Sequence, residues 1–513
     1  MAKKATTNTC CLTLPLILEK WQSDRLEKRF EIARQIYNTL LNFELKKLRR
    51  LEQSAEYSVI QNAIQKQFEG EQRDAAALKN LYQQREKFRK DAGFSEYAFK
   101  TDVKDFYKHF NDNIGSSVAV HGIASQVWAA FEKMFYGSGK AVHFKKRGDV
   151  RSLRGYSVTG KSGGVEIIFR GQFVEWKGLK LPVKHTPGNS YEEEMLQRRV
   201  KYCRIVKKPG KSKPHWYVQL MVEGLPAVKT DPKTGEVRHP HGIGAVGIDI
   251  GPQTIAYSSE TEVSLAELAD GVENIERKKR LIQRKLDRSR RATNPDNYNA
   301  DGTIKRGVKL NWVKSKAYLR SQQELAFLQH RQAGIRKRQH IELANHLLSL
   351  GDRFFVEKME WPALTRRAKE TEISEKTGRY KRKKRFGKSV GNKAPAMLIG
   401  ILKQKLISRG LDGDIEVPTS VRASQFNHIS CEYQKKPLSQ RWNEMPDGRR
   451  IQRDMYSAFL LQHINKQHDG FDLETLNRDY ANFVRLHDDV IKKLQTAPKT
   501  ISSMGIVRTA NHQ

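Results

Sequence analysis

The sequence has few cysteines and no long hydrophobic run. The four cysteines, Cys10, Cys11, Cys203 and Cys431, form no CxxC pair, so they predict neither a disulfide framework nor a zinc finger and favour a reducing compartment. No apolar run approaches the roughly 18 residues of a membrane span, and Pro15 interrupts the apolar stretch near the N-terminus. We therefore expect a soluble, cytoplasmic protein without a membrane partner.

Acidic residues are also scarce relative to basic ones. The 513 residues include 94 Lys and Arg against 57 Asp and Glu, which gives a formal net charge of +37. A compact chain with this charge repels itself, so the excess indicates a polyanionic partner, with nucleic acid as the first candidate and an anionic membrane surface as the second. The 38% of hydrophobic residues still permits real cores, and the length predicts several domains at about 100–200 residues each.

Sequence patterns divide the chain into three regions. Residues 6–18 are typical of a single β-strand whose sheet is completed elsewhere. Residues 20–137 are helical, with apolar residues at steps of three and four from Leu26 to Leu40. Short strand-like runs between glycines fill residues 138–228 and predict a small barrel or sandwich that includes the first strand. The helical region would then be an insertion into a β domain.

The third region begins with an apolar strand, a tight turn and a second strand at residues 245–259. A polar helical stretch follows, with 19 Lys or Arg against six Asp or Glu between residues 271 and 340. The strand RFFVEKM and an amphipathic helix ending at Gly410 come next. The basic segment at residues 376–388 is expected to form a loop between them.

Three acidic residues stand in apolar surroundings. Asp249 lies in VGIDIG, Glu357 in FFVEKM and Asp454 at the start of the helical pattern RDMYSAFLL. Buried acids are normally paired or bound to metal. Each one alone could be an ordinary partner for a nearby Lys or Arg, and Asp454 also suits a helix start beside Arg453. Together, two strand acids and one helix acid are what an RNase H-like nuclease uses, and Mg²⁺ or Mn²⁺ prefers such oxygen ligands.

Basic and aromatic residues near strand and helix ends are candidate nucleic-acid contacts. Arg can bridge phosphates and stack on bases, Lys acts as a point charge, and strand aromatics can stack on unpaired bases. A solvated surface explains any single residue equally well, but it does not explain the total charge. The candidates are Lys145, Lys146, Arg147, Trp176, Tyr202, Arg204, Arg284, Lys285, Arg288, Arg290 and Arg291.

Ordered motifs resemble a known family. VGIDIGPQTIAY, FFVEKMEW and QRDMYSAFL are similar to the three split RuvC motifs of the TnpB nucleases encoded by bacterial transposons, and of the type V CRISPR effectors descended from them. LPLILEKWQSDRLEKRFEIARQIYN is similar to the family's opening strand and first recognition helix, and VWAAFEKMFYGSGKAVHFKKRG and KYCRIVKK to its wedge domain. KAPAMLIGILKQKL, EVPTSVRASQ and KKPLSQRW resemble the approach to its target-nucleic-acid-binding insert. The resemblance covers nearly the whole chain.

This resemblance implies a multidomain α+β architecture. A wedge β-barrel would be split by a helical recognition domain and followed by an RNase H-like (RuvC) α/β nuclease domain, which holds a small target-nucleic-acid-binding insert. The expected boundaries are residues 1–20 and 138–240 for the wedge, 21–137 for the recognition domain, 241–416 and 453–466 for the nuclease domain, 417–452 for the insert, and 467–513 for a C-terminal helix and tail.

The resemblance also implies an RNA-guided DNA endonuclease of the bacterial or archaeal cytoplasm. Asp249, Glu357 and Asp454 would be its catalytic RuvC carboxylates and the ligands of two Mg²⁺ ions, or of Mn²⁺. A structured guide RNA, from a transposon end or a CRISPR array, would pair with double-stranded DNA beside a short motif and form an RNA–DNA hybrid. The alternative is an RNA-guided DNA-binding repressor that does not cut.

The cysteines mark one departure from the family. Many members carry two CxxC pairs in the insert, which form a zinc ribbon. Here the insert offers only Cys431, with His428 nearby, and these are too few ligands for a four-coordinate zinc site. We therefore expect an insert without zinc and with a small core formed by Phe426, Tyr433, Leu438 and Trp442.

Overall fold

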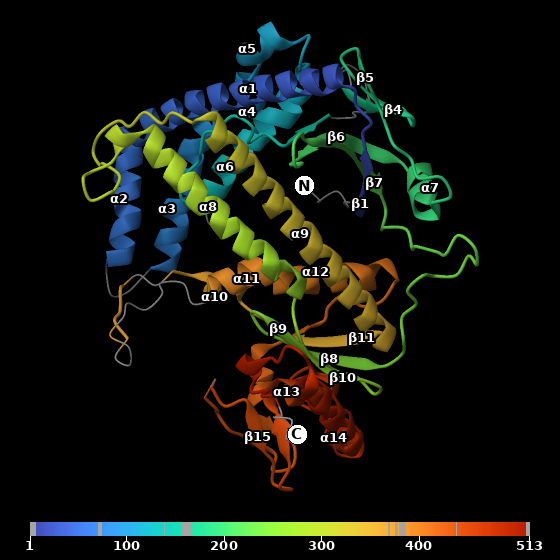
Figure 1. Ribbon diagram of the computed structural model, residues 1–513. Coiled ribbons are helices and arrows are strands. Elements are labelled where there is room, and N and C mark those ends of the chain that lie inside the picture. The colour runs from blue at the N-terminus through green and yellow to red at the C-terminus, as the bar shows by residue number, and fades with distance from the viewer. Residues whose placement is uncertain are drawn as a thin grey trace. The chain divides into compact units, whose positions relative to one another are not determined.

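The computed structural model divides the chain into two compact units, Met1–Pro226 and Ala227–Gln513 (Figure 1). It describes residues 7–69, 74–137, 139–155, 166–367, 370–374, 378, 386–437 and 439–508. Most of the basic loop expected at residues 376–388 lies outside these ranges, as does Leu438. No helix in the described ranges is long and apolar enough to cross a membrane.

Helices dominate the first half of the first unit. The long helix α1 (Lys20–Glu52) begins where the backbone N–H of Glu19 donates to Oε1 of Gln22 at 2.9 Å. The apolar residues between Leu26 and Leu40 are buried on one face of α1, which confirms the predicted periodicity. The other helices here are α2 (Ala55–Glu69), α3 (Ala75–Asp91), α4 (Glu96–Asp102), α5 (Lys104–Tyr107), η1 (Lys108–Phe110), η2 (Val118–Ala124) and α6 (Ser125–Tyr136).

Two antiparallel sheets form the rest of the first unit. β1 (Thr9–Pro15) pairs along its whole length with β7 (His215–Glu223), so the first strand does complete a sheet formed much later in the chain. The strand orders are β1-β7-β6-β2 and β3-β4-β5, and an isolated bridge between Leu16 and Val183 joins the two sheets. The remaining elements are β2 (Ser152–Arg154), β3 (Ile167–Phe169), β4 (Phe173–Trp176), β5 (Leu179–Pro182), α7 (Ser190–Gln197) and β6 (Val200–Lys208).

The strands expected for the wedge β-barrel are present in these two sheets. Within the described ranges, β2 lies at one edge of the four-stranded sheet, and β3 lies at one edge of the three-stranded sheet. Besides the Leu16–Val183 bridge, the thiol of Cys203 on β6 donates to the carbonyl oxygen of Ile167 on β3 at 3.1 Å. The predicted run of short antiparallel strands is therefore present, and its closure into a wedge β-barrel stays a prediction.

A five-stranded mixed sheet is the centre of the second unit. β8 (Ala245–Ile250), β9 (Thr254–Ser258) and β10 (Val263–Glu267) are antiparallel, while β11 (Arg353–Glu357) and β12 (Glu416–Val417) continue the sheet in parallel with β8. The order is β10-β9-β8-β11-β12. Figure 1 shows α12 on one side of this sheet and α13 and α14 on the other.

Each face of this sheet is covered by a separate core. Side chains of β8, β9 and β11 pack against α9 and α12 in one core. Residues of β9 and β10 pack against α13 and α14 in the other. The helices are η3 (Asp270–Val272), α8 (Glu273–Thr293), η4 (Pro295–Asn297), α9 (Lys316–Leu350), α10 (Trp361–Thr365), α11 (Gly387–Lys393), α12 (Pro395–Ser408), α13 (Arg453–Gln462) and α14 (Leu473–Thr496).

The helices α8 and α9 form a long hairpin with a small core of Ile275, Ile282 and Leu328. Its connection is fixed by hydrogen bonds from one side chain. Nδ2 of Asn294 donates to the carbonyl oxygen of Val313 at 2.9 Å, and Oδ1 of Asn294 accepts from the backbone N–H of Val313 at 2.7 Å. The basic helical stretch predicted between residues 271 and 340 is therefore a folded hairpin.

The region expected to be a separate insert shares the core of α13 and α14. Phe426 stacks on Phe471 with ring centroids 4.8 Å apart, and Trp442 packs against the same core. Tyr433 is 50% exposed. Phe426 also contacts Tyr433, with ring centroids 4.8 Å apart, so two of the expected core residues do meet, while Phe426 and Trp442 pack in addition against later parts of the chain. The short elements are η5 (Thr419–Val421), η6 (Ala423–Gln425), β13 (Phe426–Asn427), β14 (Glu432–Tyr433), β15 (Trp442–Glu444), β16 (Arg450–Gln452) and η7 (Ser502–Met504).

Candidate active site at one end of the five-stranded sheet

The three predicted acids come together at one end of the five-stranded sheet. Asp249 is the penultimate residue of β8, and Glu357 is the last residue of the parallel neighbour β11. Ile248 lies opposite Val356 in this ladder. Asp249 and Glu357 are the next residues on the two strands, so they lie at the same level of the sheet. Asp454 lies in the first turn of α13, which packs directly on β8. Folding thus brings together acids that are about a hundred residues apart in sequence.

A glycine makes the close approach of α13 possible. A Cβ atom on Gly247 would lie 2.0 Å from the carbonyl oxygen of Ala458 and 2.3 Å from the backbone nitrogen of Gln462. No side chain fits at these distances, so only glycine lets the helix backbone contact β8. Gln462 is also tied to the sheet, because its Oε1 accepts a 2.7 Å hydrogen bond from Oγ of Ser258.

The electrostatics show that the acids interact. Burial raises the pKa of Asp249 well above its ordinary value, and the negative charges of Asp454 and Glu357 raise it further. A hydrogen bond from Ser457 opposes these effects. Burial likewise raises the pKa of Glu357, against a 2.8 Å hydrogen bond that its Oε1 accepts from the backbone N–H of Ala423. The site therefore concentrates negative charge in a poorly solvated place.

Two arginines contact the third acid. Nε of Arg453 lies 3.3 Å from Oδ1 of Asp454, and Nη1 of Arg441 lies 3.8 Å from Oδ2. The Asp454 side chain is only 14% exposed, so these pairs are screened less than surface pairs. Arg453 was visible in sequence as a neighbour of Asp454. The sequence did not single out Arg441 as a partner of Asp454, because Arg441 precedes a separate strand, β15.

The donor set suits a hard divalent cation. Carboxylate oxygens are the preferred ligands of Mg²⁺ and Mn²⁺, and a cation would relieve the repulsion among three gathered acids. In the described part of the chain, no group of three or more His, Cys, Asp and Glu side chains is arranged to hold a metal ion. Asp454 is the member of the set whose carboxylate contacts arginines instead.

The predicted nucleic-acid contacts on α8 fall into two kinds. Arg284, Lys285 and Arg288 are exposed along the helix. Arg290 and Arg291 both pair with Asp287, at 2.8 and 3.1 Å. Their guanidinium groups also lie over the rings of Trp312 and Tyr298, 5.4 and 5.5 Å from the ring centroids. Arg284, Lys285 and Arg288 can therefore contact a ligand directly, whereas Arg290 and the half-exposed Arg291 also help to order the connection of the hairpin.

The candidates near residue 145 also differ from one another. Nζ of Lys145 lies 3.9 Å from the Tyr37 ring centroid and donates to Oε1 of Gln126 at 2.9 Å. Burial lowers the pKa of Lys145 to about 8. Its ammonium group is already engaged within the first unit, and its contact with nucleic acid stays a prediction. Lys146 and Arg147 are exposed.

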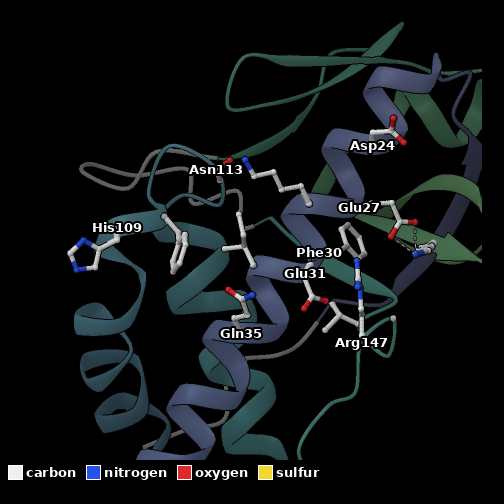
Figure 2. A pocket seen from close by; sticks show the side chains of 14 residues that line it. Asp24, Glu27, Phe30, Glu31, Gln35, His109, Asn113 and Arg147 are labelled. Atoms are coloured by element: carbon white, nitrogen blue, oxygen red, sulfur yellow. Dashed lines mark hydrogen bonds and ion pairs between the residues drawn. The ribbon is translucent and has the colours of Figure 1, made fainter. Parts of the chain in front are cut away.

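Arg147 lines the pocket of about 920 Å³ drawn in Figure 2. This pocket runs along α1, and its wall includes three acids of that helix, Asp24, Glu27 and Glu31. Arg147 lies beside Phe30 and Glu31 in this view. The wall also includes the basic residues Lys28 and Lys207, so the pocket is mixed in charge, and contact of Arg147 with nucleic acid stays a prediction.

Trp176 is a correction to the predicted set. Its side chain is fully buried, and its Nε1–H donates to the carbonyl oxygen of Ile114 at 3.0 Å. The Arg29 guanidinium lies 4.8 Å from the ring centroid. The indole therefore packs inside the first unit and has no free face on which a base could stack. The sequence showed a strand aromatic beside a lysine, but it did not show which face of the strand is buried.

The remaining two candidates lie on β6. Tyr202 is partly buried, with the Arg154 guanidinium 5.3 Å from its ring centroid. Nε of Arg204 donates to Oε1 of Gln219 on the neighbouring strand at 2.7 Å. Both side chains are thus engaged within the sheet, and their contact with nucleic acid stays a prediction.

Comparison with known proteins gives distant structural similarities. No family model matches the chain, and no curated protein does. A cryo-EM structure of a Cas12f1-sgRNA-target DNA complex is 11% identical, with a TM-score of 0.35, over 84% of this chain and 92% of that chain. A CRISPR-Cas12f ternary complex is 11% identical, with a TM-score of 0.24, over 86% of this chain and 82% of that chain. The chain therefore has a distant structural resemblance to Cas12f type V CRISPR effectors, and its own residues must support any functional proposal.

Proposed function

We propose that this protein is an RNA-guided DNA endonuclease. Its active site, formed by Asp249, Glu357 and Asp454, would cut the phosphodiester bonds of the DNA. The observation that carries the proposal is the convergence of these acids from β8, β11 and α13 at one end of the sheet. The strand order, with three antiparallel strands followed by two parallel ones, supports the RNase H-like class that the sequence motifs indicated. Burial of like charges is costly, and it is tolerated where function requires it.

Each of the three acids is stabilised by a different group of the chain. The N–H of Ala423 fixes one oxygen of Glu357, and Ser457 hydrogen-bonds to Asp249. Asp454 lies at the N-terminus of α13, where the helix dipole favours an anion. When bound by these carboxylates, two Mg²⁺ or Mn²⁺ ions would activate the attacking water and stabilise the leaving oxygen. Arg441 and Arg453 would hold Asp454 in place before a metal ion competes for it.

The partners would be a structured guide RNA and a double-stranded DNA target. The net charge of +37 supports a long polyanion, and the exposed Arg284, Lys285 and Arg288 on α8 are the best placed candidates for its phosphates. Lys146 and Arg147 are further candidates. Base pairing would supply sequence specificity while these residues hold the backbone. Sequencing the RNA that copurifies with the protein would show whether the guide comes from a transposon end or a CRISPR array.

An RNA-guided repressor that binds without cutting is the second candidate. One observation favours it: Asp454 contacts two arginines, and the described residues do not form a ready metal-ligand group. A plasmid-cleavage assay with copurified guide and Mg²⁺ separates the two functions, because only the nuclease linearises or nicks a matched plasmid.

The site assignment is tested by Asp249→Ala. We expect cleavage to fall by about a thousandfold or more, since loss of metal-supported charge stabilisation is worth several kcal/mol. RNA and target binding should survive, because the basic residues that attract phosphates are unchanged and an acid adds nothing to that attraction. Glu444→Ala, which removes a 72% exposed acid, is the matched control and should cut normally. Undiminished cutting by Asp249→Ala would overturn the assignment.

A further inference from the structure

A two-stranded ribbon delivers both arginines to Asp454. β15 and β16 are antiparallel, with Trp442 opposite Gln452 as their last pair. Arg441 immediately precedes Trp442, and Arg453 immediately follows Gln452, where α13 begins. The backbone N–H of Arg453 donates to the carbonyl oxygen of Arg441 at 2.9 Å. The position of this strand pair therefore sets the positions of Arg441 and Arg453.

The last pair of the ribbon is held by a segment from the end of the chain. We define residues 501–506, which follow α14, as the C-terminal clamp. Nε1–H of Trp442 donates to the carbonyl oxygen of Gly505 at 3.0 Å, and Nε2 of Gln452 donates to that of Met504 at 3.5 Å. Two successive carbonyl groups of the clamp thus bind the two members of one cross-strand pair.

Apolar side chains anchor the clamp beneath this pair. Ile501 is 8% exposed, Met504 is 9% exposed and Ile506 is fully buried. All three belong to the core that also contains Met455 and Phe459 of α13. Because its side chains are buried on both sides of Gly505, the clamp has a fixed position relative to the helix that carries Asp454.

Gly505 is the point where the clamp contacts the arginine strand. Its φ is +78°, a conformation that favours glycine. A Cβ atom on Gly505 would lie 2.9 Å from Cβ of Arg441 and 2.8 Å from Nε1 of Trp442. Any side chain at this position must therefore displace Arg441, Trp442 or the clamp itself.

We propose that the C-terminal clamp positions Arg441, and through it Asp454, for DNA cleavage. This inference rests on the proposed nuclease function and extends it to positioning residues outside the three acids. Gly505 and Trp442 touch Arg441 or lie next to it, and Arg441 forms the 3.8 Å ion pair with Asp454. If the clamp were purely structural, it would stabilise the core of α13 and α14, and its effect on cutting would not depend on Arg441.

The test compares Gly505→Ala with Gly448→Ala. Gly448 lies in the turn of the same ribbon with φ +80°, but a Cβ there has nothing within 4 Å. Both variants strain the backbone alike, whereas only Gly505→Ala places a methyl group against Arg441 and Trp442. We expect Gly505→Ala to cut matched plasmid about tenfold or more slowly, as for partners that orient metal ligands. Target binding should stay normal, and Gly448→Ala should cut at the wild-type rate.

A double-mutant cycle shows whether the effect passes through Arg441. In an Arg441→Ala background, Gly505→Ala should slow cutting no further. Equal slowing by Gly505→Ala in both backgrounds, or wild-type cutting by folded Gly505→Ala, would overturn the clamp. If Gly505→Ala fails to fold, Trp442→Phe takes its place, because it removes the N–H donor to Gly505 and keeps an aromatic ring.

Hydrogen exchange separates failure of the clamp from failure of the proposed function. In Gly505→Ala, amide exchange at residues 441–443 and 451–455, on either side of the turn that holds Gly448, should quicken relative to wild type and to Gly448→Ala, whether or not the protein cuts DNA. Unchanged exchange there would overturn the clamp by itself. A wild-type protein that binds its guide and target but never cuts would overturn the nuclease and leave the exchange result readable.

Discussion

Acids with a raised pKa occur in both units of the molecule, and they differ in what surrounds them. In the first unit, burial raises the pKa of Glu44 to about 8, and its side chain has no exposed surface. In the second unit, burial and two neighbouring carboxylates raise the pKa of Asp249 well above its ordinary value. A raised pKa alone therefore does not distinguish the two places.

The surroundings of Glu44 are those of a structural group. Nζ of Lys47 lies 2.7 Å from Oε2 of Glu44 and 2.9 Å from Oδ2 of Asp102. The same ammonium group lies within 5.3 to 5.6 Å of the centroids of three phenylalanine rings. One lysine thus serves two acids inside an aromatic cluster, and the local charge is nearly balanced.

The acids of the second unit are arranged differently. Three carboxylates from three elements meet at the end of a sheet, and the nearest cations contact Asp454. Negative charge is therefore in excess at Asp249 and Glu357, where burial makes it most costly. The comparison teaches that convergence of unmatched charge from separate elements, more than the burial of a single acid, identifies the candidate site.

The largest expected effect comes from breaking that convergence at Gly247. Gly247→Ala places a methyl group 2.0 Å from the Ala458 carbonyl oxygen, so α13 must move away from β8. We expect a loss of about 3 kcal/mol in the free energy of unfolding, as for severe overpacking. Cleavage should fall sharply even at temperatures where the variant is folded, because Asp454 moves with α13. Chemical denaturation and plasmid cleavage measure the two effects.

Gly334→Ala is the control for this substitution. Gly334 lies inside α9, and a Cβ there has nothing within 4 Å. It should therefore stabilise the helix by up to ~1 kcal/mol and leave cutting unchanged. If Gly247→Ala folded and cut like this control, close packing of α13 on β8 would not be what assembles the acids.

The sequence was sufficient to predict all three acids of the candidate site because each lies in a distinctive local pattern. Asp249 and Glu357 interrupt apolar strands, and Asp454 begins a helix with an apolar face. The β1 strand and the C-terminal helix α14 were also predicted from local patterns. Properties of one short segment are what a single sequence records well.

Features that depend on contacts between distant segments were not predictable in this way. Arg441 reaches Asp454 only because β15 pairs with β16. Glu44 lies in α1 like many exposed polar residues, and its partner Lys47 reaches Asp102 and Phe99 of α4 only in the folded chain. Trp176 looked like a surface aromatic because the sequence did not show which strand face is covered. Each case needs the tertiary structure to decide which side of an element is buried.

The second prediction uses metal binding to separate the two acid sites. If the three carboxylates hold Mg²⁺, the ion stabilises the folded protein by about 1.4 kcal/mol at ten times its dissociation constant. Asp249→Asn should abolish this rise in thermal stability, whereas Glu44→Gln should keep it. Thermal unfolding with and without Mg²⁺, in the absence of nucleic acid, measures the difference. An undiminished Mg²⁺ effect in Asp249→Asn would place the ion elsewhere.

The smallest expected effect on cleavage is at Glu44, where removal of the titrating group should stabilise the protein and leave cutting unchanged. The folded pKa of about 8 exceeds the ordinary value of 4.5, so the folded protein keeps a proton that the unfolded chain releases between these values. Wild-type stability from this group is therefore lost as pH rises from 4.5 to 8. Glu44→Gln does not titrate, so it should be more stable than wild type by up to about 3 kcal/mol at pH 7, relative to the difference at pH 4.

The pH dependence of that difference decides whether Glu44 is a structural group. The gap between Glu44→Gln and wild type should be absent near pH 4, grow to about pH 8 and then stay constant. Hydrogen exchange in α1 and α4 would measure it locally in the full chain, with Glu52→Gln, an exposed acid at the end of α1, as the flat control. If the difference in stability did not change with pH, the charges of Glu44 and Lys47 would not balance each other as their contacts indicate. Reduced cutting by Glu44→Gln would break the comparison itself, because it would give the buried acid of the first unit a role in the reaction.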